Sequence, residues 1–164
     1  MDEFIQTILS LVRTIEEQER LRANIDALSE SLYKSFPNVF NEVLRTKFSA
    51  RIGELFRVFF EKPSYMRNPG LIKVELEAIQ TAVSAMRPLR LEIAFEPNEV
   101  FIERIATWVT AHIANDIVLD IVRDQMVGGG ARIIFRGRYK ENTLVDMVED
   151  VFARKRDMVM KELQ

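Results

Sequence analysis

The chain has 164 residues, of which 48% are hydrophobic and 29% charged, values typical of a globular protein rather than a disordered one. Lys and Arg total 23 against 25 Asp and Glu, so the net charge of −2 lacks the basic excess of a dedicated nucleic-acid binder. There is no cysteine, which excludes disulfides, thiolate zinc sites and a cysteine nucleophile.

The N-terminal sequence does not have the pattern of a signal peptide. It carries acidic residues where a signal peptide requires positive charge, and its apolar residues are interrupted. The uninterrupted apolar runs of the chain are only a few residues long, whereas a membrane-spanning helix needs about 20 apolar residues. We therefore expect a soluble chain that reaches a membrane only indirectly, through a partner protein.

The first predicted element is one long helix over residues 3–34, a stretch without Gly or Pro. Its apolar residues follow a helical stripe that is interrupted at Gln18 and Glu19. The stripe consists of Ile5, Ile8, Val12, Ile15, Leu21, Ile25, Leu28 and Leu32. The stripe indicates one of two arrangements. Either it packs on the chain's own domain, or it is an exposed surface for a partner helix or for a second copy of the chain. In the last case the chain would self-associate through helix 3–34.

Two further helices are predicted in the N-terminal half. Residues 39–62 have an apolar face wider than a simple stripe, which favours a helix covered on more than one side. Residues 71–86 have a single apolar side, and Pro88 ends that helix. The sequence therefore predicts a helical region over residues 1–88.

From residue 89 the apolar period changes from 3.6 to 2, which predicts strands. The predicted elements are a strand at 89–95, a helix capped by Asn98, strands at 116–124 and 131–139, and a last helix that begins at Asn142-Thr143. The predicted fold class is α+β, with the N-terminal helical region followed by a small β-α-β-β-α domain at residues 89–164.

The strands at 116–124 and 131–139 are predicted to pair as an antiparallel hairpin. In the register we expect, Leu119 lies opposite Phe135, Asp116 opposite Arg138 and Val122 opposite Arg132. Three successive glycines are expected to supply the positive φ angles of the turn: Gly128, Gly129 and Gly130. A phosphate-binding loop is not indicated, because that motif leads from a strand into a helix and ends in Gly-Lys-Ser/Thr.

The sequence predicts no catalytic residue, no metal site and no cofactor. His112 is the single histidine, and no second imidazole or nucleophile accompanies it. Asp116, Asp120 and Asp124 resemble a ligand set, but residues four apart on a strand are separated by roughly 13 Å, too far to share one metal ion. We expect these aspartates to oppose the arginines of the partner strand, with Asp124 as an alternative cap of the turn.

The strongest basic patch is predicted on the strand after the glycines. It consists of Arg132, Arg136, Arg138 and Lys140, which share one face of the predicted strand. No aromatic residue interleaves with them on that face, which disfavours stacking of single-stranded nucleic acid. The patch indicates either a solvated face neutralised by the neighbouring aspartates or a docking face for an acidic protein partner.

Residues 116–151, DIVLDIVRDQMVGGGARIIFRGRYKENTLVDMVEDV, resemble the C-terminal region of the F-type ATP synthase delta subunit, the oligomycin-sensitivity-conferring protein family. The shared pattern is an apolar strand, an Asp, a Gly-Gly turn, a second strand ending near a Gly, and a Thr that opens the last helix. The matching residues are Asp124, Val127, Gly128 to Gly130, Ile133 to Phe135, Gly137 and Thr143. The resemblance is confined mainly to residues 89–164, because the family's first domain is a compact helical bundle and this chain opens with a long charged helix instead.

The resemblance implies a mechanical function without a cofactor. It implies a non-catalytic stator subunit of the peripheral stalk, which links the catalytic head to the membrane-anchored b subunits during proton-driven ATP synthesis. The expected partners are the alpha and b subunits of the ATP synthase. The N-terminal helices would face the head, and residues 89–164 would face the stalk. The expected location is cytoplasmic, peripheral on the inner face of the cell membrane as part of the complex.

Three alternatives remain open. A stalk protein of the E type, from a vacuolar or archaeal-type rotary ATPase, also combines a long N-terminal helix with a compact α+β end. A small RNA-binding α+β module would use the basic strand, although the near-neutral charge and the missing Gly-x-x-Gly clamp disfavour it. An enzyme would need a partner chain to complete its site.

Overall fold

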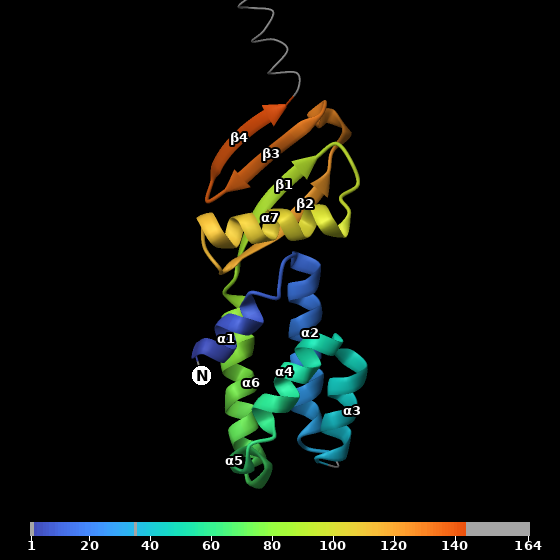
Figure 1. The fold of residues 1–164 in the computed structure, drawn as a ribbon, viewed down its shortest axis with the longest axis vertical. Helices are drawn as coiled ribbons and strands as arrows, with labels where there is room; N and C mark the ends of the chain where they lie inside the picture. Colours follow the sequence, from blue (N-terminus) through green and yellow to red (C-terminus); the bar gives the residue numbers. More distant parts are fainter. Residues whose placement is uncertain (1, 35, 144–164) are drawn as a thin grey trace, which may run out of the picture. The chain divides into compact units, whose positions relative to one another are not determined.

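The computed structural model describes residues 2–34 and 36–143. Within these residues the fold is α+β, as predicted: helices precede the first strand, and most of the strands follow in the C-terminal half (Figure 1). The last helix predicted from Asn142-Thr143 onward extends into residues outside the described part. Residues 142 and 143 themselves belong to a strand, not to a helix.

The chain divides into two compact units. The helical unit comprises residues up to 87 together with 106–118, and the sheet unit comprises 88–105 together with the described residues from 119 onward. The predicted division into domains 1–88 and 89–164 remains a prediction. The two compact units are defined by spatial contacts, which do not show whether either part of the chain folds independently.

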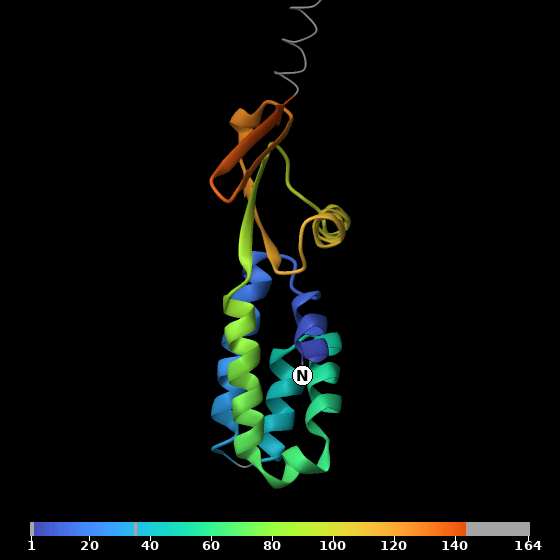
Figure 2. The same cartoon turned by 90° about the vertical axis from the view of Figure 1, so that its left-hand side faces the viewer.

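Six helices make up most of the helical unit (Figures 1 and 2). Their bounds are α1 Asp2–Leu9, α2 Ile15–Ser31, α3 Asn38–Lys47, α4 Ala50–Phe60, α5 Pro63–Arg67 and α6 Pro69–Ser84. Two of the three predicted N-terminal helices are divided, 3–34 into α1 and α2 and 39–62 into α3 and α4, whereas the predicted helix 71–86 corresponds to α6 and the short α5 precedes it. The apolar periodicity continues across these breaks because both members of a pair contribute to one core.

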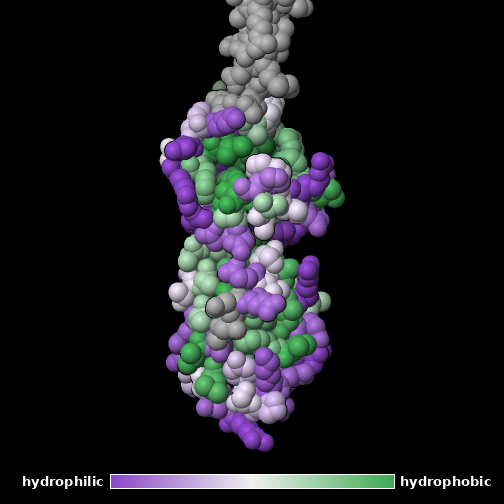
Figure 3. Space-filling view, turned by 60° about the vertical axis from the view of Figure 1, so that its left-hand side comes forward, coloured by the Kyte–Doolittle hydropathy of each residue, from purple (hydrophilic) through white to green (hydrophobic). Residues whose placement is uncertain are grey.

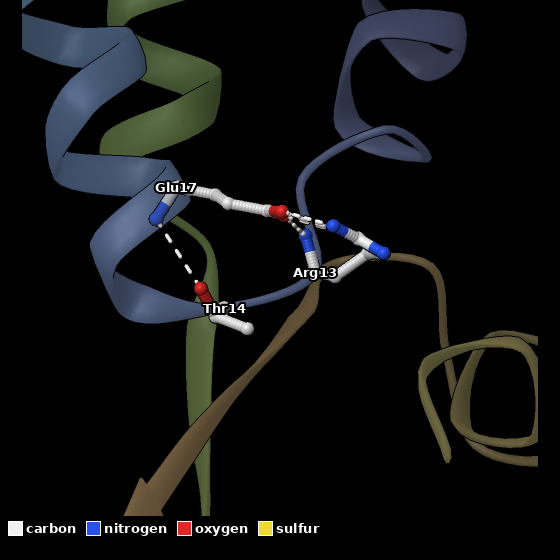
Figure 4. Close-up of polar contacts among 3 residues, drawn as sticks. All are labelled: Arg13, Thr14 and Glu17. Atoms are coloured by element: carbon white, nitrogen blue, oxygen red, sulfur yellow. Dashed lines mark hydrogen bonds and ion pairs between the residues drawn. The ribbon is translucent and has the colours of Figure 1, made fainter. Parts of the chain in front are cut away.

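The predicted continuous helix 3–34 is wrong, because the chain turns at residues 10–14 between α1 and α2. Figure 4 shows the reason: the Thr14 hydroxyl caps α2 by accepting from the Glu17 backbone N–H at 3.3 Å, and the Glu17 carboxylate accepts from the Arg13 backbone N–H at 2.8 Å. The pattern Thr-x-x-Glu is a capping-box sequence, which marks a helix start without Gly or Pro.

The second break separates α3 from α4 at Phe48 and Ser49. Both residues are extended, with ψ angles of 153° and 152°, and the Ser49 side chain accepts from the Ile52 backbone N–H at the start of α4. A serine cap therefore divides a helix that the sequence predicted as continuous from 39 to 62.

The apolar stripe of the first helix pair is buried in the core of the helical unit. Ile8, Ile25 and Leu28 have at most 1% of their surface exposed. Phe56 and Phe60 on α4 are also buried, and their rings lie 5–6 Å from several others: Phe4, Phe40, Phe48, Phe59 and Tyr65. The interpretation that the stripe packs on the chain's own domain is confirmed.

Gly53 permits a close approach of α4 to the end of α3. A Cβ atom at position 53 would lie 2.9 Å from the Leu44 carbonyl oxygen and 3.5 Å from the Phe48 Cβ. Because the nearer atom belongs to the backbone, it cannot rotate away as a side chain would. The glycine is therefore required by packing between the two helices.

Four strands form one sheet in the order β2-β1-β3-β4. Their bounds are β1 Arg87–Ile93, β2 Ile117–Arg123, β3 Gly130–Phe135 and β4 Arg138–Thr143. β1 and β2 are parallel: the Arg87 N–H donates to the Asp116 carbonyl at one end, and the Asp124 N–H donates to the Ile93 carbonyl at the other. Helix α7 (Glu99–His112) is the crossover between them, and the Asn98 side chain caps it by accepting from the Phe101 N–H at 2.9 Å, as predicted.

The predicted hairpin of residues 116–124 with 131–139 is wrong. β1 lies between β2 and β3, and β3 pairs antiparallel with β1, so that Leu91 lies opposite Ile133 and Glu92 opposite Arg132. β1 has the same apolar alternation as β2, and such a pattern fixes which face a residue occupies without fixing which strand is its neighbour. The predicted pairs Leu119–Phe135, Asp116–Arg138 and Val122–Arg132 therefore do not form.

A tight turn divides the predicted strand 131–139 into β3 and β4. Arg136 and Gly137 connect the two strands with φ angles of 52° and 71°, and Phe135 pairs with Arg138. Two central residues with positive φ are typical of the two-residue hairpin turns that follow strand twist. The hairpin of this sheet is therefore β3–β4, and its turn is Arg136-Gly137.

We expect Glu17→Gln to lower the free energy of unfolding at neutral pH by up to about 1 kcal/mol, because Gln keeps an acceptor oxygen but loses the charge that pairs with Arg13 and faces the start of α2. Burial favours the neutral acid, but the hydrogen bonds and charge of Arg13 outweigh it and hold the pKa of Glu17 below its ordinary value of 4.5. The stabilisation should therefore be present above pH 4.5 and disappear as the pH falls through the folded-state pKa. Denaturant unfolding at several pH values measures it.

The matched control is Glu16→Gln, which removes a neighbouring exposed charge from the same first turn of α2. This variant reports the general effect of charge at the helix start. Equal losses for the two variants, or a loss for Glu17→Gln that persists at low pH, would contradict a stabilising role of the Glu17 charge.

We expect Gly53→Ala to destabilise the protein by about 1–3 kcal/mol, the usual cost of overpacking. At an exposed helical position without a clash, the same change stabilises by up to about 1 kcal/mol. The sign of the change in thermal or denaturant unfolding is thus the test, and a gain in stability would show that α3 and α4 do not approach as described.

Candidate protein-docking surfaces

The helical unit has an apolar groove of about 580 Å³ between α3, α4 and the start of α6. Its lining includes Phe36, Phe40, Leu44, Phe48, Phe60, Met66 and Ile72. The floor is rigid because Phe40, Leu44, Phe48 and Phe60 are themselves core residues. This volume is within the range of ligand pockets and accepts a few large apolar side chains of a partner.

The rim of this groove carries charges that largely balance. On α4 the Arg57 guanidinium bonds to Glu54 at 2.5 Å and also to Glu61. The hydrogen bond with Glu54 raises the pKa of Arg57, and the same bond lowers the pKa of Glu54, so this pair stays ionised. Arg45 is exposed at the groove and has no ion-pair partner within the described residues. An apolar floor with an ionic rim suits the apolar face of an amphipathic helix.

One face of the sheet is ionic. Arg132 on β3 lies 3.6 Å from Glu92 on β1 and 3.1 Å from Asp124, which follows β2. Arg90 contacts Glu92 at 3.0 Å and Asp120 on β2 at 3.7 Å. The side chains of Glu92 and Arg132 are only 14% and 25% exposed. The charges on this face therefore neutralise one another and do not form a free basic patch.

The opposite face of the sheet is apolar but unevenly covered. Leu91 on β1 is 5% exposed, whereas its cross-strand neighbour Ile133 on β3 is 38% exposed. Phe135 follows on the same side of β3 and is half-buried. Figure 3 shows apolar side chains gathered at the surface of the part that carries the strands, with hydrophilic side chains around them. The open area lies over β3.

The predicted basic patch is divided between the two faces. Arg132 lies on the ionic face, while Arg138 and Lys140 lie opposite Phe135 and Ile133 and share the apolar face with them. Arg136 is in the turn, 5.4 Å from the Phe135 ring. The prediction that Arg132, Arg136, Arg138 and Lys140 share one strand face is wrong, because the turn at 136 and 137 reverses the chain between them.

The three glycines lie between β2 and β3 and not in a hairpin. A short 3₁₀ helix, η1 Gln125–Val127, follows β2, and Gly128, Gly129 and Gly130 then have φ angles of 58°, 83° and 103°. The predicted need for positive φ is confirmed. The turn they form leads past β1 to β3, because β2 and β3 are not neighbours.

The three predicted aspartates are held separately by arginines and by the backbone. Asp116 bonds to Arg87 at 2.8 Å, which lowers the pKa of Asp116, and Asp120 faces Arg90. Asp124 accepts from the Met126 N–H at 2.9 Å, so its predicted role as a cap is confirmed. The expectation that the aspartates oppose arginines of the strand after the glycines is confirmed for Asp124 with Arg132 and wrong for Asp116 and Asp120, whose arginines belong to β1.

His112 is exposed on α7, where its ring stacks on Trp108 at 4.9 Å and its Nδ1 lies 2.9 Å from the Trp108 carbonyl. Over residues 2–34 and 36–143 there is no group of three or more His, Cys, Asp or Glu side chains that could hold a metal ion. In the same part of the chain no helix is both long and apolar enough to cross a membrane.

The sequence did not indicate the groove, although it showed the apolar residues that line it. The wide apolar face of residues 39–62 predicts only that these residues are buried. The break at Ser49 divides the segment into two helices, and the groove lies between them. The local signal was Ser49 itself, a residue that favours helix starts.

Comparison with models of known protein families finds no match. A search among curated proteins likewise finds no similar sequence.

Proposed function

We propose that the protein is a non-catalytic stator subunit of an F-type rotary ATP synthase, which joins the catalytic head to the peripheral stalk. The proposal starts from the resemblance of residues 116–151 to the delta subunit. The class of function is binding of two partners, which requires apolar contact surfaces and needs neither an acid nor a metal.

The architecture of the helical unit supports this proposal. The family's first domain is a compact helical bundle, and α1 to α6 pack around one core that includes Ile8, Leu28 and Phe56. The long charged first helix, which departs from the family's pattern in the sequence, is divided by the Thr14 cap into two helices of that bundle.

The observation that carries the proposal is the apolar groove of the helical unit. Its phenylalanine floor and balanced ionic rim suit a short amphipathic helix, as expected for a segment of a head alpha subunit. Each large apolar side chain that enters such a groove contributes roughly 1.5–3 kcal/mol from burial. A few such anchors suffice for a slowly dissociating joint.

The sheet unit is the proposed contact for the b subunits. Arg136, in the exposed turn between β3 and β4, remains the candidate for docking an acidic partner segment. Arg132 is excluded from this role, because Glu92 and Asp124 already neutralise it.

The alternative of an E-type stalk protein is disfavoured by the first two helices. A long free helical arm would leave its stripe exposed, whereas Ile8, Val12 and Leu21 are at most 4% exposed within the chain's own core. The same burial removes the stripe as a surface for self-association. The RNA-binding alternative loses its basic strand face, because that face does not form.

We expect the full chain to co-purify with alpha and b subunits of the ATP synthase from its own cells. Met66→Asp, which places a charge in the groove, should weaken binding of the head at least about tenfold. Val74→Asp is the matched control, because Val74 is exposed on α6 and does not line the groove. Titration with purified head, at equal thermal stability of both variants, measures the difference.

Co-purification with ribosomes or RNA instead of ATP synthase subunits would refute the proposal. Equal weakening by Met66→Asp and Val74→Asp would leave the stator role intact but move the head contact away from the groove.

A further inference from the structure

The sheet unit has an apolar area that its described residues do not cover. Leu89, Leu91 and Ile93 on β1 are at most 5% exposed, whereas on the adjacent β3 Ile133 is 38% exposed and Phe135 half-buried. β1 and β3 are paired, so these residues belong to one continuous face. A sheet face of this kind is stable in water when another element covers it.

The residues directly after β4 have the composition to cover this area. β4 ends at Thr143, opposite Gly130 at the start of β3, and 21 residues follow it, up to and including Gln164. Their first half contains a helical apolar stripe with steps of three and four, formed by Leu144, Met147, Val148, Val151 and Phe152. An amphipathic stripe of this kind needs an apolar surface to pack on.

The length of the segment after β4 and the place where it begins also fit the open area over β3. A helix of ten residues extends about 15 Å, against about 20 Å for a six-residue strand such as β3. A helix that begins directly after β4, near the Gly130 end, can therefore run back along β3 without a long connection.

Charge complements the apolar match. Lys140 lies opposite Ile133 and Arg138 opposite Phe135, so both cations border the open area. The residues that flank the stripe include Asp146, Glu149 and Asp150. Long basic side chains at the border of an apolar contact can reach such carboxylates while their stems cover apolar surface.

We infer that residues 144–164 dock on the open apolar face of β3 in the same chain, with the stripe from Leu144 to Phe152 against Ile133 and Phe135. This contact would complete the apolar face of the sheet unit, with the ionic face of Arg132 and Glu92 left toward solvent. The inference concerns the chain by itself and does not rest on the proposed stator function.

The absence of cysteine allows a direct test in the full chain. The variant Ile133→Cys with Val148→Cys is treated with a short bis-maleimide, and the monomer is digested to detect the bridged peptides. The matched control is Ile134→Cys with Val148→Cys, because Ile134 is the next residue of β3 and belongs to the opposite, ionic face. Both variants are first compared with the parent chain for cooperative unfolding.

We expect an intramolecular bridge in the first variant that forms at least about tenfold faster than in the control and at a rate independent of protein concentration. Adding Val151→Asp to the first variant should reduce the bridge to the level of the control, because a carboxylate would enter the apolar contact. Equal rates in both variants would overturn the inference. Bridged dimers whose yield rises with concentration would also overturn it and assign the face to a second copy of the chain.

Discussion

The helical unit depends on the burial of two phenyl rings one turn apart on α4. Phe56 and Phe60 are fully enclosed, and between them they contact rings from α1, α3 and α5. Ring pairs of this kind contribute about 0.5–1.5 kcal/mol each beyond their burial. They require α4 to approach its neighbours closely, and Gly53 makes that approach possible against the Leu44 carbonyl. The groove is a consequence of the same packing, since Phe60 and the rings of Phe40 and Phe48 form its floor and are held in the core by these contacts, so they cannot move in to fill it.

The sequence predicted the fold class, the order of helices first and strands later, and the buried side of the helices in the helical unit. The prediction of which strands lie side by side in the sheet was wrong, and the reason is physical. β1, β2 and β3 each carry apolar residues at every second position, so this pattern alone does not decide which strand lies beside which. The choice is made by the crossover helix α7, which places β2 parallel to β1, and by Arg132, which reaches Glu92 and Asp124 together only when β1 is central. Neither constraint is visible from the period of the pattern.

The ends of elements were missed where a side chain, and not Gly or Pro, defines them. Thr14 and Ser49 each start a helix by accepting a backbone N–H, and the chain on either side keeps its apolar periodicity because both helices contribute to the same core. The turn at Arg136 was missed because a non-glycine residue with positive φ is rare. This last miss had the largest effect on the candidate site. It reversed the direction of the chain after Phe135 and so divided four basic residues, predicted as one patch, between two faces of the sheet.

The two faces of the sheet differ in how many of their side chains already have contacts within the chain. On the ionic face the charges are paired, whereas on the apolar face part of the surface is uncovered. On the ionic face every described cation has a carboxylate nearby, so this face offers a partner little beyond partly exposed ion pairs, which contribute roughly 0–1 kcal/mol each. On the apolar face Ile133 and Phe135 keep exposed surface beside Arg138 and Lys140, and apolar area is worth about 25 cal/mol per Å² when it is covered. The driving force for contact with anything outside the described sheet is therefore concentrated over β3. A rigid joint needs such a surface to be occupied permanently, because an element that covers β3 also restrains the edge strand β4 and the turn that carries Arg136.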